Sequence, residues 1–272
     1  MILVADIGGT KTRVARGEAG GAHSAPVVYA TPRSYREGIA RLTKELRSAA
    51  GAERISMVVI AIAGVLAKDH ARVLRSPHLP DWNGMDLESD LAHALNANVR
   101  IENDAALAAL GEALHGAGRG ADIVAYLSIG TGVGGARIVK GAIDRSASGF
   151  EPGHQYVSMN PPRTLEELVS GTALRMRFHR PAEELFDKEV WEECAQTLAY
   201  GIHNAILFWS PDVVVLGGTM MTGNPRIRTE RVAEHVRELM RIFPFVPDIR
   251  LAAFGDSAGL VGALAYAKRH ER

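Results

Sequence analysis

Apolar runs that stop at glycine recur along the chain and predict buried strands. Residues 1–7 (MILVADI), 55–63 (ISMVVIAIA), 123–129 (IVAYLSI) and 211–216 (PDVVVL) are all apolar or nearly so and are followed by one or two glycines. A run of this length between turn residues is typical of a strand covered on both faces. Shorter alternating runs predict further strands at 12–16, 25–31, 97–103, 135–143 and 248–254.

Helices are predicted where apolar residues return every three or four positions. Such spacing dominates from about 165 to 209, whereas 150–164 is rich in proline and polar residues and is expected to be a loop. The other predicted helices cover 34–50, 85–96, 104–116, 228–243 and 257–270.

The order of these elements predicts an α/β protein with two similar domains and a cleft between them. Each half begins with an apolar strand, a glycine turn and a second strand, at 2–16 and 123–143. We expect one domain from 1–115 plus 258–272 and the other from 116–257, with hinges near 110–122 and 255–259.

The amino-acid composition bears on whether the protein binds nucleic acid or a membrane. The 272 residues contain 31 basic and 31 acidic side chains, so the net charge is zero and gives no general attraction to nucleic acid or anionic lipid. The start lacks a basic leader, and the longest apolar stretch, 58–67, is about half a membrane span. We therefore expect a cytoplasmic protein without nucleic-acid or membrane partners.

The only cysteine is Cys194, which excludes an intramolecular disulfide. It lies within helical apolar spacing and is expected to be a buried core thiol.

The glycine-rich turn at 130–135 (GTGVGG) formally contains G-x-G-x-x-G. A dinucleotide site needs a helix after the glycines, but an alternating strand pattern follows here, and a Walker A sequence is absent. The remaining choices are a plain tight hairpin or a hairpin whose backbone amides face an anion, aided by the hydroxyls of Thr10 and Thr131.

Two further features carry candidate chemistry. Glu151 and His154 flank Pro152-Gly153, which fits half a metal site, an acid–base pair, a ligand clamp or a surface turn. Asp104 opens a predicted helix, where it could act as a general base or only stabilise the helix dipole by about 0.3–1 kcal/mol.

Five segments together resemble the ROK family of sugar kinases and sugar-responsive repressors. They are DIGGTKT (6–12), IENDA (101–105), SIGTGVGGA (128–136), EPGH (151–154) and VVVLGG (213–218), in the family's order. The resemblance extends to the terminal helix. It implies two actin-like (ribonuclease-H-like) domains with mixed β-sheets flanked by helices, and an active site in the interdomain cleft.

The resemblance also implies an activity, the ATP-dependent phosphorylation of a hexose hydroxyl with Mg²⁺. Asp104 would be the general base. Glu167 is the register alternative to Glu166 among the sugar contacts. The implied substrate-binding residues are Asn103, Asp104, Glu151, His154, Glu166, His78 and Gly64.

For the nucleotide, the resemblance implies two phosphate loops, with Asp6 holding Mg²⁺ through water. The implied ATP and phosphate contacts are Asp6, Gly8, Gly9, Thr10, Lys11, Thr131, Gly132, Gly217 and Gly218.

The chain departs from the family in two places. Many members bind zinc with the Gly-His histidine and three cysteines of the next loop, but 155–164 contains no cysteine. Since structural zinc needs four Cys or His ligands, we expect no structural zinc. His78 stands where the family usually has asparagine, and the identity of the sugar is left open.

Three alternatives remain beside an ATP-dependent kinase. A repressor would need an added DNA-binding segment, which the chain's start does not suggest. A catalytically silent sugar-binding protein would keep the same motifs. A kinase using polyphosphate is a relative without the zinc cysteines, although its first loop differs from DIGGTKT. By resemblance alone, we expect a homodimer.

Overall fold

The computed structural model describes residues 1–18, 22–144 and 149–270. The chain forms two compact units. The first contains Met1–Gly111 and the segment that starts at Ser257, and the second contains Glu112–Asp144 and Phe150–Asp256. Each unit is built on a mixed five-stranded sheet.

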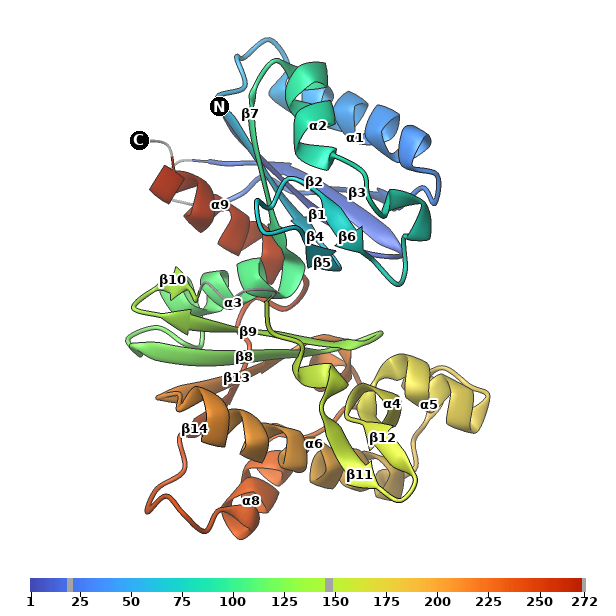
Figure 1. The fold of residues 1–272 in the computed structure, drawn as a ribbon, viewed down its shortest axis with the longest axis vertical. Helices are drawn as coiled ribbons and strands as arrows, with labels where there is room; N and C mark the ends of the chain where they lie inside the picture. The colour runs from blue at the N-terminus through green and yellow to red at the C-terminus, as the bar shows by residue number, and fades with distance from the viewer. Residues whose placement is uncertain (19–21, 145–148, 271–272) are drawn as a thin grey trace. The chain divides into compact units, whose positions relative to one another are not determined.

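The sheet of the first unit has the order β3-β2-β1-β4-β7 (Figure 1). β1 pairs antiparallel with β2 but parallel with β4, and β4 pairs parallel with β7. All six residues of β4 are buried, as its uninterrupted apolar sequence predicts. The strands of this unit are β1 (Ile2–Ile7), β2 (Lys11–Arg16), β3 (Val27–Ala30), β4 (Met57–Ile62), β5 (Val65–Leu66), β6 (Val73–Arg75) and β7 (Asn98–Asn103).

Helices cover both faces of this sheet. Leu3 and Ile7 of β1 belong to the core that includes Leu42 and Leu91 of α1 and α2. Asp6, whose side chain alternates to the other face, lies against Gly259 of α9. The helices that begin in this unit are α1 (Tyr35–Ala50), η2 (Pro80–Trp82), α2 (Leu87–Leu95), α3 (Asp104–His115) and α9 (Ala258–His270), and η5 (Gly255–Ser257) spans the boundary between the units.

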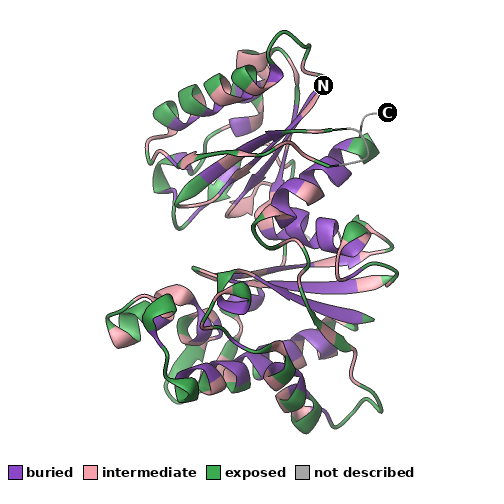
Figure 2. Cartoon of the chain, turned by 180° about the vertical axis from the view of Figure 1, so that it is seen from behind, coloured by how far each residue is buried: buried purple, intermediate pink, exposed green. Residues whose placement is uncertain are grey.

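The second unit repeats the same topology, β10-β9-β8-β13-β14. β8 pairs antiparallel with β9 and parallel with β13, which is parallel to β14. In Figure 2 the central strands of both sheets are coloured as buried. The strands are β8 (Ile123–Ile129), β9 (Val133–Val139), β10 (Ala142–Ile143), β11 (Tyr156–Met159), β12 (Pro162–Thr164), β13 (Val213–Gly217) and β14 (Asp248–Leu251).

The core of the second unit lies between this sheet and the long helix α6 with its neighbour α8. Leu127 and Leu216 from the sheet join Leu198 of α6 and Val236 of α8 in one buried cluster. The helices are η3 (Pro152–His154), α4 (Glu166–Val169), α5 (Gly171–Phe178), η4 (Ala182–Glu184), α6 (Lys188–Trp209), α7 (Thr219–Thr222) and α8 (Thr229–Leu239).

A buried carboxylate links two chain segments of the second unit by hydrogen bonds. Glu112, near the end of α3, is fully buried. Its carboxylate accepts hydrogen bonds from the backbone N–H groups of Ala117 at 2.9 Å, Ala253 at 3.0 Å and Phe254 at 2.9 Å. One side chain therefore joins the turn after α3 to the segment after β14.

The structure confirms the α/β class with two mixed sheets flanked by helices, but it corrects two local predictions. Residues 150–164 are not simply a loop, because β11 and β12 form an antiparallel hairpin with a register shift between Tyr156 and Ser158. The helix expected over 228–243 ends at Leu239. Two prolines, Pro244 and Pro247, follow close behind that end.

Cys194 is 2% exposed on α6, as expected for a core thiol. Burial raises its pKa to about 12, so the reactive thiolate is strongly disfavoured. Among the described helices, none combines the length and apolar character that crossing a membrane requires.

Candidate functional site

The first glycine turn is a tight connection between β1 and β2. Its ends are closed by the Gly8 N–H, which donates to the Lys11 carbonyl at 3.0 Å. The Thr31 hydroxyl donates to the Gly8 carbonyl at 2.7 Å. This fixes the turn's backbone, while Thr10 and Lys11 stay exposed at its tip. The arrangement is a hairpin and not the start of a helix, which excludes a Rossmann-type phosphate site here.

Asp6 precedes this turn, and its position follows from the strand register. Asp6 and Arg13 lie opposite each other on β1 and β2, and Arg13 Nη1 is 3.8 Å from Asp6 Oδ2. Gly259, at the start of α9, leaves space beside the carboxylate, since a Cβ there would lie 3.5 Å from Asp6 Oδ2. Asp6 is thus a partly accessible carboxylate with a cation beside it.

Asn103 and Asp104 mark the point where β7 becomes α3. The Asn103 side-chain oxygen accepts from the Ala106 N–H at 3.0 Å and so caps the helix. Its side-chain nitrogen donates to the Gly64 carbonyl at 3.1 Å. Asn103 is therefore held at both ends and joins the carboxyl ends of the adjacent strands β4 and β7.

Asp104 occupies the first position of α3. Burial raises the pKa of its carboxyl group above the ordinary value, because loss of water disfavours the charged form. The backbone N–H groups of Ala105 and of Asp104 itself, together with the charge of His78, oppose that rise. The Ala105 N–H lies 2.8 Å from Asp104 Oδ1. A carboxylate with a raised pKa and a fixed orientation suits proton transfer.

His78 lies against the first glycine turn. A Cβ on Gly9 would overlap with the Cβ of His78, so only a glycine permits this approach. His78 is itself exposed, and its charge acts on Asp104. Within the first unit, His78 therefore contacts the first glycine turn and acts electrostatically on Asp104.

The second glycine turn, between β8 and β9, also connects two antiparallel strands, but it is one residue tighter than the first. The Gly130 N–H donates to the Gly132 carbonyl at 2.9 Å. The start of α5 also contacts this turn, because the Gly171 N–H donates to the Gly130 carbonyl at 2.8 Å. The exposed Thr131 stands at its tip, where Thr10 stands in the first turn.

Glu166 lies beneath this second turn. Its Oε2 accepts from the Val133 N–H at 2.7 Å, and a Cβ on Gly132 would lie 2.5 Å from the same oxygen. The register alternative, Glu167, instead accepts from the Thr164 N–H at 2.8 Å within its own helical turn. Of the two carboxylates, Glu166 is the one placed beside the glycine turn.

The Glu-Pro-Gly-His segment packs onto the same hairpin. Pro152 and Gly153 are buried, and a Cβ on Gly153 would overlap with the Val133 carbonyl. Glu151 and His154 remain exposed on either side of this anchored pair. The second unit therefore gathers Glu151, His154 and Glu166 around the β8–β9 turn.

Gly217 ends β13 and Gly218 follows it before α7, next to Ile129, which precedes the second turn. Gly217 packs against Tyr126, whose hydroxyl would be 2.5 Å from an added Cβ. Gly218 has φ of 88° and crowds the Ile129 carbonyl, so a side chain would be strained as well as blocked. This leaves backbone without side chains next to the second glycine turn.

Sequence reasoning missed three polar residues that support these groups. Arg13 was detectable in principle, because a tight turn sets the β1–β2 register and places it opposite Asp6. Gln155, next to His154, makes side-chain hydrogen bonds that no local pattern reveals. Buried Glu102 also supports the Asn103 backbone, accepting from its N–H at 3.0 Å.

The oxygen ligands of the site suit magnesium better than structural zinc. Magnesium in phosphate-transfer sites is usually bound by one or two carboxylates, substrate phosphates and water, and Asp6 is a suitable oxygen ligand. Within residues 1–18, 22–144 and 149–270, no group of three or more His, Cys, Asp or Glu side chains is arranged to hold a metal ion. The expectation of no structural zinc stays a prediction.

A search of protein families matches residues 2–270 to one model, described as the ROK family. The chain is 26% identical to a glucokinase of Thermotoga maritima, over 85% of this chain and 84% of that enzyme. It is 30% identical to a kanosamine kinase of Amycolatopsis mediterranei, over 96% of this chain and 94% of that protein.

The fold also matches solved structures along its whole length. One is a ROK family glucokinase from Streptomyces griseus in complex with glucose and AMPPNP. The TM-score is 0.83 at 23% identity, and the match covers 98% of this chain and 99% of that one. At this identity the likeness concerns the fold, and the fold-class prediction is confirmed.

Proposed function

Because the chain belongs to the ROK family, we propose that it is a sugar kinase that transfers the terminal phosphate of ATP to a hydroxyl of a hexose or hexose derivative. The observation that carries the proposal is Asp104, a carboxylate with a raised pKa at the start of α3, next to the fixed amide of Asn103. The names of similar proteins, among them a glucokinase and a kanosamine kinase, support the same reaction class.

In the proposed reaction, Asp104 accepts the proton of the acceptor hydroxyl. The hydroxyl oxygen forms a bond to the terminal phosphorus of ATP while the bond from that phosphorus to the ADP oxygen breaks. Such a reaction needs positioned reactants and neutralised phosphate charge more than covalent help from the protein. The raised pKa of Asp104 makes it a stronger base than an ordinary carboxylate once it is ionised.

The donor side of the reaction is assigned to the two glycine turns. Backbone N–H groups and the hydroxyls of Thr10 and Thr131 would contact phosphate oxygens, and Lys11 would add positive charge. Asp6 would hold Mg²⁺, which neutralises phosphate charge when bound. Arg13 Nη1 lies 3.8 Å from Asp6 Oδ2, on the same side of the turn. The nucleotide's adenosine would lie on the bare backbone of Gly217 and Gly218.

The acceptor side is assigned to polar groups of both units. In the first unit, the proposed sugar contacts beside Asp104 are Asn103, His78 and the Gly64 backbone. In the second, Glu151, His154 and Glu166 offer carboxylates and an imidazole, which pair well with vicinal hydroxyls. Since Glu166 already accepts from the Val133 N–H through Oε2, its other oxygen is the one proposed to meet the sugar.

The proposal is tested by measuring ADP release over a panel of hexoses, amino sugars and N-acetylhexosamines. The Asp104→Asn variant serves as the blank, because it keeps the side chain's size while removing the base. ADP release that depends on one sugar and disappears in the variant supports the proposal. Sugar binding without any turnover would instead support the catalytically silent alternative.

The phosphate donor requires its own assay. ATP is proposed here, since the DIGGTKT turn favours a nucleotide over polyphosphate. Product formation is compared with ATP and with polyphosphate at matched phosphate concentration. Turnover with polyphosphate alone would overturn the ATP assignment while leaving the sugar-kinase proposal intact.

The proposed enzyme is a cytoplasmic homodimer. The second unit exposes large apolar side chains, with Phe208 at 82% and Phe245 at 76%, which an interface would remove from water. Light scattering at several protein concentrations gives the mass in solution, and a constant monomer mass would contradict the dimer.

A further inference from the structure

The Glu151–His154 turn needs support from outside itself. Only Pro152 and Gly153 at its centre are buried, whereas Glu151 and His154, the two side chains assigned to the sugar, are exposed. The turn is a single 3-10 segment of three residues, and no side chain caps its start. Packing against Val133 and Gly135 of β9 holds the centre of the turn, and the residue that follows can hold its end.

Gln155 supplies that support immediately after His154. Its amide nitrogen donates to the Pro152 carbonyl at 2.8 Å and to the Gly201 carbonyl of α6 at 3.3 Å. Its amide oxygen accepts from the side-chain nitrogen of Asn204, also on α6, at 2.9 Å. Because carbonyls only accept, the orientation of the amide is determined by its surroundings.

The backbone of Gln155 extends the same connection to a third element. Its carbonyl accepts from the Leu165 N–H at 2.9 Å. Leu165 directly precedes Glu166, which lies beneath the second glycine turn. One residue therefore connects the turn of Glu151 and His154, the helix α6 and the start of α4.

The packing of α6 makes room for this connection. At Gly201 an added Cβ would lie 2.5 Å from a methyl carbon of Leu165 and 3.3 Å from the Gln155 amide nitrogen. α6 is also the longest helix of the described chain and lies in the core of the second unit. Gln155 is thus attached to a rigid element.

We propose that Gln155 is a positioning residue for the sugar, which holds Glu151, His154 and Glu166 in one geometry by linking them to Gly201 and Asn204 of α6. The inference rests on the proposed function, because it assumes that these three side chains bind the acceptor sugar. Gln155 itself is not assigned a contact with the sugar. Its effect is expected on sugar affinity and not on the nucleotide.

Three substitutions remove different numbers of the side-chain hydrogen bonds of Gln155. Gln155→Ala removes all the side-chain bonds. Gln155→Glu keeps the acceptor for Asn204 but turns a carboxylate oxygen toward two carbonyls. Of the bonds to Gln155, Asn204→Ala removes only the one to the amide oxygen, and it also removes a 3.5 Å contact with His203. We expect the sugar KM to rise by about five- to thirtyfold in both Gln155 variants, the equivalent of one or two hydrogen bonds, and less in Asn204→Ala.

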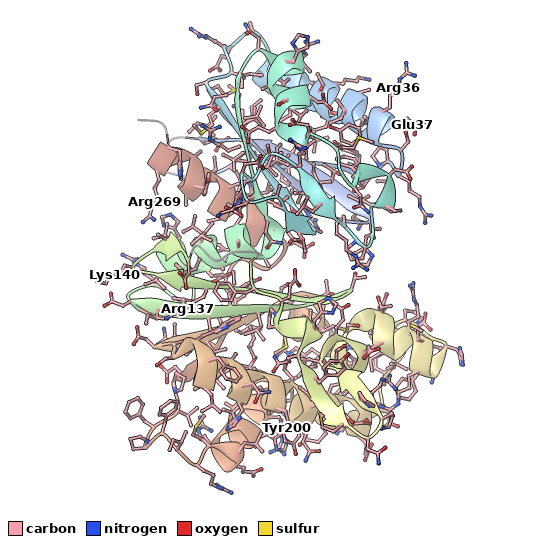
Figure 3. The ribbon with its side chains drawn as sticks, viewed as in Figure 1. Arg36, Glu37, Arg137, Lys140, Tyr200 and Arg269 are labelled. Atoms are coloured by element: carbon pink, nitrogen blue, oxygen red, sulfur yellow. The ribbon has the colours of Figure 1, made fainter. Side chains whose placement is uncertain are left out.

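The KM for ATP is the readout that separates positioning from general destabilisation. It should stay near the wild-type value in all three variants, since neither glycine turn loses a hydrogen bond. Arg231→Ala is the matched control, because Arg231 binds Glu192 of α6 at 2.5 Å on the side facing α8. Tyr200→Ala is a second control on α6, at an exposed residue next to Gly201 (Figure 3).

Glu151→Ala and His154→Ala test the sugar site itself, separately from the positioning role of Gln155. If they raise the sugar KM and the Gln155 and Asn204 variants do not, the positioning role is wrong while the sugar site stands. If Glu151→Ala and His154→Ala leave the sugar KM unchanged, both are wrong. Equal rises in both KM values, or changes matched by Arg231→Ala, also overturn the inference. Should Gln155→Ala fail to fold, Asn204→Ala carries the test.

Discussion

At the scale of single residues, Asp104 is the group on which the proposed chemistry depends most. Replacing Asp104 by asparagine keeps its size and removes the proton acceptor. We expect kcat to fall by about 10²–10⁴-fold, the usual contribution of a general base. Steady-state kinetics at saturating sugar and ATP measure the change. A variant with wild-type kcat would remove Asp104 from the catalytic role.

The raised pKa of Asp104 also predicts how activity depends on pH. Only the ionised carboxylate accepts a proton, so kcat/KM should decline as the pH falls through the pKa of this group. Because burial raises that pKa, the decline should begin above the range of an ordinary aspartate, which titrates near about 3.9. A pH–rate profile with the fold monitored by circular dichroism gives the result. An acid limb at or below the ordinary value would contradict it.

The same shift predicts the effect of Asp104 on stability. An acid whose pKa is raised on folding disfavours its ionised form in the native state, so it destabilises the protein at pH values above that pKa. Asp104→Asn should therefore not lower the melting temperature at pH 7. Any gain should shrink as the pH falls through the raised pKa. Calorimetry at pH 7 and at acidic pH tests this, and a lower melting temperature at pH 7 would contradict it.

At the scale of elements, Glu112 is a buried carboxylate whose removal should lower the free energy of unfolding. Glu112→Ala would leave the N–H groups of Ala117, Ala253 and Phe254 without their acceptor. These three N–H groups belong to half-buried or exposed residues, so water can replace part of the lost bonds. Since a buried unsatisfied group costs about 1–3 kcal/mol, we expect a loss within that range in the free energy of unfolding. Urea denaturation measures it. Glu53→Ala, at an exposed residue, is the control and should change stability little. Equal effects of the two would contradict the assignment.

Elements with a strong apolar period were predictable from the sequence, and those held by tertiary contacts were not. β4 and β13 were evident as apolar runs because they are buried along their whole length. The β11–β12 hairpin was missed because its prolines and polar residues suggest a loop. Such short strands gain their order from neighbouring helices, which no local pattern encodes.

The candidate site was predictable to a similar degree. The two glycine turns and the start of α3 lie where strands end, so sequence order alone indicated them. The links between Gln155, Gly201 and Asn204 join residues more than forty positions apart. The approach of His78 to Gly9 depends in the same way on the folded first unit. The assigned roles of all these residues stay predictions.

At the scale of the whole molecule, metal removal should affect activity and stability differently. EDTA should abolish phosphate transfer by removing Mg²⁺, and added Mg²⁺ should restore it. EDTA should leave the melting temperature unchanged, because we predict no structural zinc. Elemental analysis of protein purified without a histidine tag completes the test. One zinc per chain, or a lower melting temperature in EDTA, would contradict the prediction.

The burial of Cys194 makes selective labelling of introduced cysteines possible. With its only thiol buried and its pKa raised to about 12, the native protein should be almost inert to maleimide and methanethiosulfonate probes. Exposed sites such as Glu53 in one unit and Glu183 in the other can then be converted to cysteine and labelled selectively. Paired spin labels at these positions would report the separation of the two units, with and without sugar, in the otherwise native sequence.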